Sequence, residues 1–277
     1  MDELDRKISK VLSEWELPNG IDKNTAWQNI LNTIQTDQKK LFFIKKWHWA
    51  AASIIILMLS SALFYTSIIE FESFNKEQLA INLPDGSIVN LNAASTLSYN
   101  KLLWYVNRNV TLKGEGYFKV KKGSQFIVST KQGSVRVLGT EFNVFARKNN
   151  FNVACYKGSV EVKNNTNSIV IVKGEKTNNI INNTLIKSSL NKTSISPNWL
   201  NGVFVYSDAL LADVINEIGR QYDVEFSSNE SINSNTFTGE WNTKMPLEDV
   251  LEIVLLPFGL ETNYKAPKLI EISSKTI

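Results

Sequence analysis

The chain has 277 residues, of which 43% are hydrophobic and 21% are charged, a composition typical of a folded protein of about two domains. Its net charge of +3 comes from nearly balanced totals of 30 basic and 27 acidic residues. The basic residues are scattered rather than gathered along one helix, which excludes the electrostatic footprint of a nucleic-acid-binding protein. We therefore expect no direct binding to nucleic acid.

Residues 1–46 are predicted to form a short helical arm. Apolar residues recur at helical spacing in two runs, which Pro18 and Gly20 separate. The apolar positions are Leu4, Ile8, Leu12 and Trp15 in the first run and Trp27, Ile30, Leu31 and Ile34 in the second. Two helices this short cannot build a core of their own, so the pattern predicts a protein partner. A loosely folded tail, or an arm lying on a membrane surface, is the alternative.

Residues 47–69 are predicted to form one transmembrane helix. They contain no Asp, Glu, Lys or Arg, and their length suffices to cross the ~30 Å of hydrocarbon in a bilayer. The run lies too far from the first residue for a cleavable signal peptide. Lys45 and Lys46 precede it, whereas Glu70 and Glu72 follow it. The positive-inside rule therefore predicts a single-pass protein of the cell inner membrane, with a cytoplasmic N-terminus and a periplasmic C-terminus.

Residues 70–177 are expected to form an all-β domain. Short runs alternate apolar and polar residues, and turn signals such as Asp85-Gly86 and Lys157-Gly158 separate them. This rhythm fits a sandwich, a barrel or a β-solenoid equally well. Residues 178–198 are rich in Asn, Ser and Thr and are expected to form a hinge-like linker.

Residues 199–277 are expected to form a small α+β domain with two strand–helix–strand units. Ser207 and Asp208 are suitable N-cap residues for the first helix, and Pro246 is a suitable start for the second. The two helices are expected to pack on one small sheet. The whole chain is therefore predicted to be mostly β, with an α+β domain at its C-terminal end.

Enzymatic chemistry is not expected. The one histidine is His48, so the region beyond the apolar run lacks the histidine that common hydrolytic and zinc sites use. No phosphate-binding loop, dinucleotide fingerprint or zinc-ligand spacing is present. We therefore expect no cofactor and no metal, and we expect the single cysteine, Cys155, to be a packing residue.

The run from residue 137 to 144 contains an unusual Gly139-Thr140 pair. The simpler interpretation is a bulge or tight bend at Gly139. The alternative is a self-cleavage site, in which the Thr140 hydroxyl attacks a strained Gly139 carbonyl and cuts the chain.

Several short motifs follow one another in the β domain. They are Leu83-Pro84-Asp85-Gly86-Ser87, Leu91-Asn92-Ala93, Gly114-Glu115-Gly116-Tyr117-Phe118, Leu138-Gly139-Thr140 and Phe142-Asn143-Val144. In this order they resemble the FecR family of transmembrane anti-sigma factors, particularly its Bacteroidota branch. The C-terminal part, with Leu200-Asn201-Gly202 and Phe204, resembles the STN-like domain that follows in that family.

The resemblance implies a β-solenoid-like first periplasmic domain and a signalling role. Members of the family hold an extracytoplasmic-function sigma factor through the cytosolic arm. They contact the signalling domain of a TonB-dependent outer-membrane transporter through the C-terminal domain. The apolar positions of residues 1–46 would then be the sigma-binding residues. A different class of function is a membrane-tethered periplasmic binding or scaffold module without a sigma partner.

Overall fold

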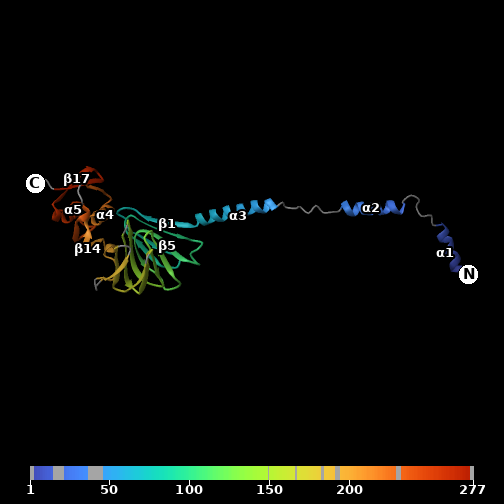
Figure 1. Ribbon diagram of the computed structural model, residues 1–277, viewed down its shortest axis with the longest axis horizontal. Coiled ribbons are helices and arrows are strands. Elements are labelled where there is room, and N and C mark those ends of the chain that lie inside the picture. Colours follow the sequence, from blue (N-terminus) through green and yellow to red (C-terminus); the bar gives the residue numbers. More distant parts are fainter. Residues whose placement is uncertain are drawn as a thin grey trace. The chain divides into compact units, whose positions relative to one another are not determined.

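The computed structural model describes residues 3–14, 22–36, 46–148, 150–165, 167–181, 184–190, 194–228 and 232–274. The chain divides into two compact units, Met1–Ser61 and Ala62–Ile277. Figure 1 shows the helices and strands in chain order, from α1 at the N-terminal end to the helices and strands of the C-terminal domain.

The described part of the arm forms two separate helices, as predicted. They are α1 (Glu3–Glu14) and α2 (Lys23–Thr36). A third helix, α3 (Lys46–Thr66), covers most of the uncharged run but ends before residue 69, because Ile68 and Ile69 belong to the first strand. In the part of the chain that the structure describes, no helix has both the length and the apolar character needed to cross a membrane.

One curled, nearly closed sheet of 13 strands forms the β domain. Its strands are β1 (Ile68–Ser73), β2 (Leu79–Asn82), β3 (Ile88–Leu91), β4 (Ser95–Asn100), β5 (Arg108–Lys119), β6 (Phe126–Ser129), β7 (Ser134–Val137), β8 (Glu141–Arg147), β9 (Asn150–Lys157), β10 (Ser159–Lys163), β11 (Ser168–Val172), β12 (Glu175–Ile181) and β13 (Thr184–Ser189). The predicted all-β domain is confirmed.

Strand β5 connects the two halves of this sheet. Its first half pairs with β4 and β6, and its second half pairs with β3 and β8. Gly114 lies at the change of partners, with a φ of +108°, and a Cβ atom there would lie 2.8 Å from the Cα of Ser95. Only glycine can occupy this position without moving the neighbouring strand. The domain's core lies inside the curl, where Phe118 stacks on Phe142 with ring centroids 5.1 Å apart.

This arrangement differs from the β-solenoid that the resemblance implied. Among the described strand pairs of the sheet, only β5 and β6 run parallel, and the others run antiparallel. Parallel rungs stacked along one axis would require many parallel pairs. Alternating polarity within a strand does not specify its partner, so the sequence pattern could not distinguish these architectures.

The linker predicted at residues 178–198 is shorter than expected. Strand β13 lies within it and pairs with β12 as an antiparallel hairpin. Leu185 of β13 is buried in the core of the β domain. The Asn-rich composition predicted a linker where the chain forms strand β13, which has one buried apolar residue.

The C-terminal domain has the predicted order of strands and helices. Its elements are η1 (Asn198–Asn201), β14 (Val203–Leu210), α4 (Leu211–Tyr222), β15 (Glu225–Ser228), η2 (Ile232–Ser234), β16 (Thr236–Asn242), α5 (Leu247–Leu255), η3 (Leu256–Phe258), β17 (Leu260–Ala266) and β18 (Leu269–Ser274). Pro246 occupies the N-cap position of α5.

Two details of this domain differ from the prediction. The strands form two small sheets rather than one, because β14 pairs with β16 while β15 and β17 both pair with β18. Ser207 and Asp208 lie in β14 and do not cap α4, whose N-cap residue is Leu210. A bulge in β14 places the backbone N–H of Asp208 2.9 Å from the hydroxyl of Thr238, which is its acceptor.

Candidate functional site

The β domain and the C-terminal domain share a buried apolar core. Tyr117 of β5 and Tyr156 of β9 pack edge to face, with ring centroids 5.8 Å apart. Both belong to the same buried cluster as Trp199, Phe204 and the apolar faces of α4 and α5. The C-terminal domain is therefore docked on the β domain through a shared buried core. We call this contact region the joint.

The polar part of the joint is centred on the buried carboxylate of Glu115. Its two oxygen atoms accept hydrogen bonds from the side-chain amides of Asn92 and Asn143, each at 2.8 Å. Asn143 in turn accepts a hydrogen bond from the indole N–H of Trp199 at 3.2 Å. Asn92 accepts one from the amide of Gln221 at 2.9 Å. Residues of the β domain and the C-terminal domain thus satisfy one another's buried polar groups.

Helix α4 contributes a second carboxylate to the joint. Glu217 accepts hydrogen bonds from the Nε of Arg220 at 3.1 Å and from Gln221 at 2.9 Å. Arg147, at the end of β8, supplies a further positive charge. It donates to the backbone carbonyls of Ala93 at 2.6 Å and Ala94 at 2.8 Å.

The two buried carboxyl groups differ in acidity. Burial and the nearby charge of Glu217 raise the pKa of Glu115, although Arg147 opposes the shift. Burial would also raise the pKa of Glu217, but Arg220 and Arg147 outweigh it and hold that pKa below its usual value. Glu217 is therefore the charged partner of the two guanidinium groups, and Glu115 is the first of the pair to take up a proton as the pH falls.

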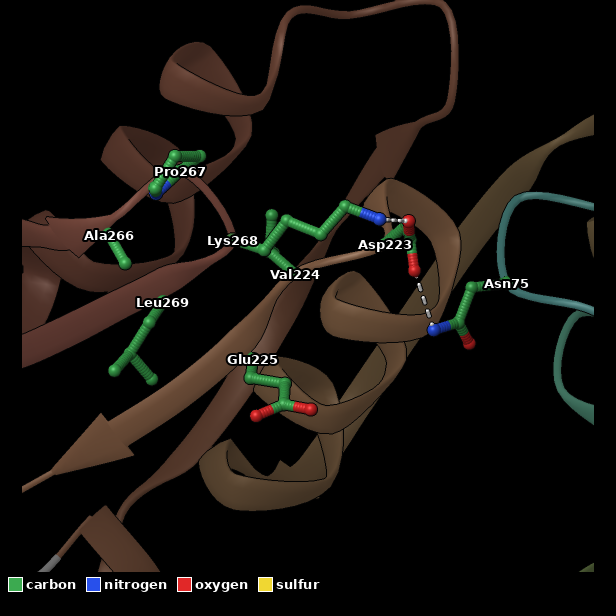
Figure 2. Close-up of a pocket in the computed structure, with 8 residues that line it drawn as sticks. All are labelled: Asn75, Asp223, Val224, Glu225, Ala266, Pro267, Lys268 and Leu269. Atoms are coloured by element: carbon green, nitrogen blue, oxygen red, sulfur yellow. Dashed lines mark hydrogen bonds and ion pairs between the residues drawn. The ribbon is translucent and has the colours of Figure 1, made fainter.

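A surface pocket of about 520 Å³ lies beside the joint. Asp223 is the C-cap residue of α4. Figure 2 shows the side chains of Lys268 and Asn75 both directed at its carboxylate. The amide of Asn75, which follows β1, donates to Asp223 at 2.9 Å, and Lys268 forms an ion pair with the same residue. These hydrogen-bond partners hold the pKa of Asp223 below its usual value. This exposed contact is a second link between the two domains.

The predicted sigma-binding residues that the structure describes lie on α1 and α2. Leu4, Ile8 and Ile30 are exposed, and the side chain of Trp27 is 61% exposed. Leu31 is half-buried. Trp15 lies outside the described residues, and so do the side chains of Leu12 and Ile34. The structure thus leaves the described apolar face of each helix largely uncovered.

Residues 70–161 match the family described as FecR protein, and residues 203–257 match the family described as FecR, C-terminal. The two matches together cover more than half of the chain. The chain belongs to the FecR family. No curated protein sequence matches it.

Two solved structures have a fold similar to that of this FecR-family chain. Both are crystal structures of a proposed anti-sigma factor from Parabacteroides distasonis ATCC 8503, at 2.50 Å and 1.65 Å resolution. The first is 26% identical in sequence and has a TM-score of 0.69. The match covers 76% of this chain and 100% of that structure's chain. The second is also 26% identical, covers 75% of this chain and all of its own, and has a TM-score of 0.68.

The FecR motifs meet at the joint. Asn92 belongs to the Leu-Asn-Ala motif, Glu115 to the Gly-Glu-Gly motif and Asn143 to the Phe-Asn-Val motif. Sequence reasoning missed these residues as site residues, and it missed their partners Glu217 and Gln221. The sequence did contain a signal for these residues, because each is a polar side chain at a core-facing position in an apolar run. A buried polar side chain needs a buried partner.

The Leu-Pro-Asp-Gly-Ser motif of this FecR protein closes the β2–β3 hairpin. Asp85 accepts hydrogen bonds from the backbone N–H of Ser87 at 2.9 Å and from the Nε of Arg108 at 2.8 Å. The hydroxyl of Ser87 accepts a hydrogen bond from the backbone N–H of Lys121 at 2.9 Å. Gly86 has a φ of +78°, which glycine tolerates best. The motif therefore has a structural role, because it ties the β2–β3 hairpin to Arg108 and Lys121.

Asp85→Asn is expected to lower the free energy of unfolding at neutral pH by about 1–3 kcal/mol, because it weakens charge-assisted hydrogen bonds. Burial opposes ionisation of Asp85, but Ser87 and Arg108 outweigh it and lower its pKa from 3.8. The stabilisation is present above pH 3.8 and is lost as the pH falls through the lower pKa of the folded state.

The difference in the free energy of unfolding between wild type and Asp85→Asn should therefore become smaller in acid. Urea titrations at several pH values would measure it. The exposed Asp208→Asn variant is the control and should leave the stability unchanged. A constant difference across the whole pH range would contradict this account of Asp85.

Gly139 and Thr140, the predicted self-cleavage pair, lie at a close contact between chain segments. A Cβ atom at Gly139 would lie 2.7 Å from the Cα of Lys122, which explains the glycine. The buried hydroxyl of Thr140 donates to the carbonyl of Ser159 at 3.0 Å. It would have to leave this acceptor before attacking the Gly139 carbonyl. Self-cleavage stays a prediction that this geometry does not test.

Proposed function

We propose that this FecR-family protein is an anti-sigma regulator whose arm, residues 1–46, holds an extracytoplasmic-function sigma factor. The observation that carries the proposal is the exposure of apolar side chains, led by Trp27, on two helices too short to form a core. The likeness to a proposed anti-sigma factor supports it. The role is regulatory rather than catalytic.

The arm would bind its sigma factor by laying helices in a groove. An amphipathic helix offers anchors at positions i, i+3, i+4 and i+7, and Trp27, Ile30, Leu31 and Ile34 have this spacing. Large aromatic side chains often dominate the energy of such contacts, so Trp27 is the expected anchor.

The protein is proposed to be anchored in the cell inner membrane by residues 47–69, with the arm in the cytoplasm and the β domain in the periplasm. The support is in the sequence, which places lysines before the uncharged run and glutamates after it. Helix α3 forms over most of this run.

The C-terminal domain, which resembles an STN-like domain, is proposed to receive the signal from the signalling domain of a TonB-dependent outer-membrane transporter. Strands β15 and β17 each pair only with β18 in the described part of the chain, so each has an edge that could accept a further strand. The signal would then reach the β domain through the joint, because the buried contacts between the two domains lie there.

Reporter fusions would test the membrane orientation. A reporter that is active only in the periplasm should be active when fused after Asn75 and inactive when fused after Lys40, because the lysine-rich flank stays in the cytoplasm. The opposite pattern would contradict the orientation and with it the anti-sigma role. Activity at neither position would contradict the membrane anchor.

A further inference from the structure

The turn between β4 and β5 carries a compact patch of exposed apolar side chains. Leu102 and Leu103 are exposed, Tyr105 is 88% exposed and Val106 is 79% exposed. Together these four residues are named the turn patch. Isolated exposed apolar residues are common, but several of them gathered on one turn indicate an interaction surface.

The turn patch is anchored to the core of the β domain. Trp104, between its members, is only 2% exposed and packs edge to face on Tyr99, with ring centroids 4.9 Å apart. The side-chain oxygen of Asn100 accepts hydrogen bonds from the backbone N–H groups of Leu102 at 2.9 Å and Leu103 at 3.0 Å. The buried tryptophan and the capped turn therefore hold the backbone of the turn, and the four apolar side chains are left exposed.

The turn patch lies beside the C-terminal end of α3. The backbone N–H of Lys101 donates to the carbonyl of Ser67 at 2.9 Å. Asn100, the last residue of β4, is paired with Ile68, the first residue of β1. Phe64 and Ile68 are themselves exposed and apolar. Exposed apolar residues thus occur both at the end of α3 and on the turn, with the exposed Lys101 between them.

The apolar surface ends where acidic side chains begin. Along β1, exposed Ile68 is followed by the exposed residues Glu70 and Glu72. At the far end of β1, Ser73 pairs with Ser95, and Lys76 just beyond donates its backbone N–H to the carbonyl of Arg220 at 2.9 Å. The turn patch and the joint therefore lie at opposite ends of β1. Along β1 the apolar patch comes first, the acidic side chains follow, and the joint comes last. This order suits a domain whose apolar end contacts a lipid bilayer.

The geometry points to the turn patch as a second membrane contact, which inserts Leu102, Leu103, Tyr105 and Val106 into the outer interfacial layer of the bilayer beside α3. This inference rests on the proposed membrane anchor. Tyrosine suits the interface because its ring is apolar and its hydroxyl reaches water. A contact at two places fixes the orientation of the β domain on the membrane, so that the joint faces away from the bilayer.

Single-cysteine labelling of the full chain in lipid nanodiscs would test the inference. Cys155→Ser removes the native thiol, whose sulfur lies 3.7 Å from the carbonyl of Lys157 and 3.5 Å from that of Gly158. Three variants in this background, Tyr105→Cys, Leu57→Cys and Leu256→Cys, would carry a fluorophore sensitive to water. Nanodiscs with and without quencher-bearing lipids would then be compared. Leu256 is the matched control, because it is an exposed apolar residue of the C-terminal domain.

The labels at positions 57 and 105 should emit at shorter wavelength and lose most of their emission to lipid quenchers, whereas the label at 256 should not respond. Quenching at 57 without quenching at 105 would overturn the turn-patch inference and leave the anchor standing. No quenching at 57 would overturn both. A label at 105 that is shielded from water but insensitive to the quenching lipids would show that a protein covers the patch, and would also overturn the inference.

Discussion

Glu217→Ala is expected to lower the free energy of unfolding by about 3–5 kcal/mol, because it removes a buried carboxylate and leaves two partly buried guanidinium groups without their charged partner. The side chain of Glu217 is 6% exposed and that of Arg220 is 19% exposed. Urea unfolding of the purified protein would measure the change.

The matched control for this change is Glu161→Ala. Glu161 also pairs with an arginine, Arg136, at 2.9 Å, but both side chains are substantially exposed. Surface pairs of this kind contribute at most about 1 kcal/mol. Equal losses for Glu217→Ala and Glu161→Ala would contradict the view that the joint holds the two domains together.

Trp27→Ala and Ile30→Asp are each expected to weaken sigma-factor binding by at least about 1–2 kcal/mol, or roughly fivefold to thirtyfold in Kd. The first change removes the largest apolar side chain described on α2, and the second places a charge on the same face. Asn29→Ala is the control, because Asn29 lies on the opposite face of the helix. Fluorescence anisotropy with a labelled arm would rank the three variants. An equal effect of all three would contradict docking through this face.

The helical elements could be predicted because their apolar residues repeat with a period that only a helix satisfies. Helix α4 is an example, with Leu211, Val214, Ile215 and Ile218 all buried. Strand partners could not be predicted, since alternation says which face is buried and not which strand lies alongside. Strand β13 was missed because its single buried apolar residue, Leu185, stands among polar residues.

The joint could not be assembled from the sequence because its members are far apart in the chain. Asn92 and Glu217 lie 125 positions apart and approach to 3.4 Å only in the folded protein. Each polar residue taken alone looked like an exception in an apolar run. The resemblance identified the motifs that contain Asn92, Glu115 and Asn143, but it did not show that these residues meet a helix of the next domain.

The measurement that tests the anti-sigma role most directly is calorimetric titration of a sigma factor encoded beside this protein with a peptide of residues 1–46. The account predicts binding with a negative heat-capacity change, because apolar helix faces leave water, and a clear loss of affinity in the Trp27→Ala peptide. Absence of binding by the peptide and by the intact protein to every co-encoded sigma factor would contradict the anti-sigma role. The scaffold module without a sigma partner would then take its place.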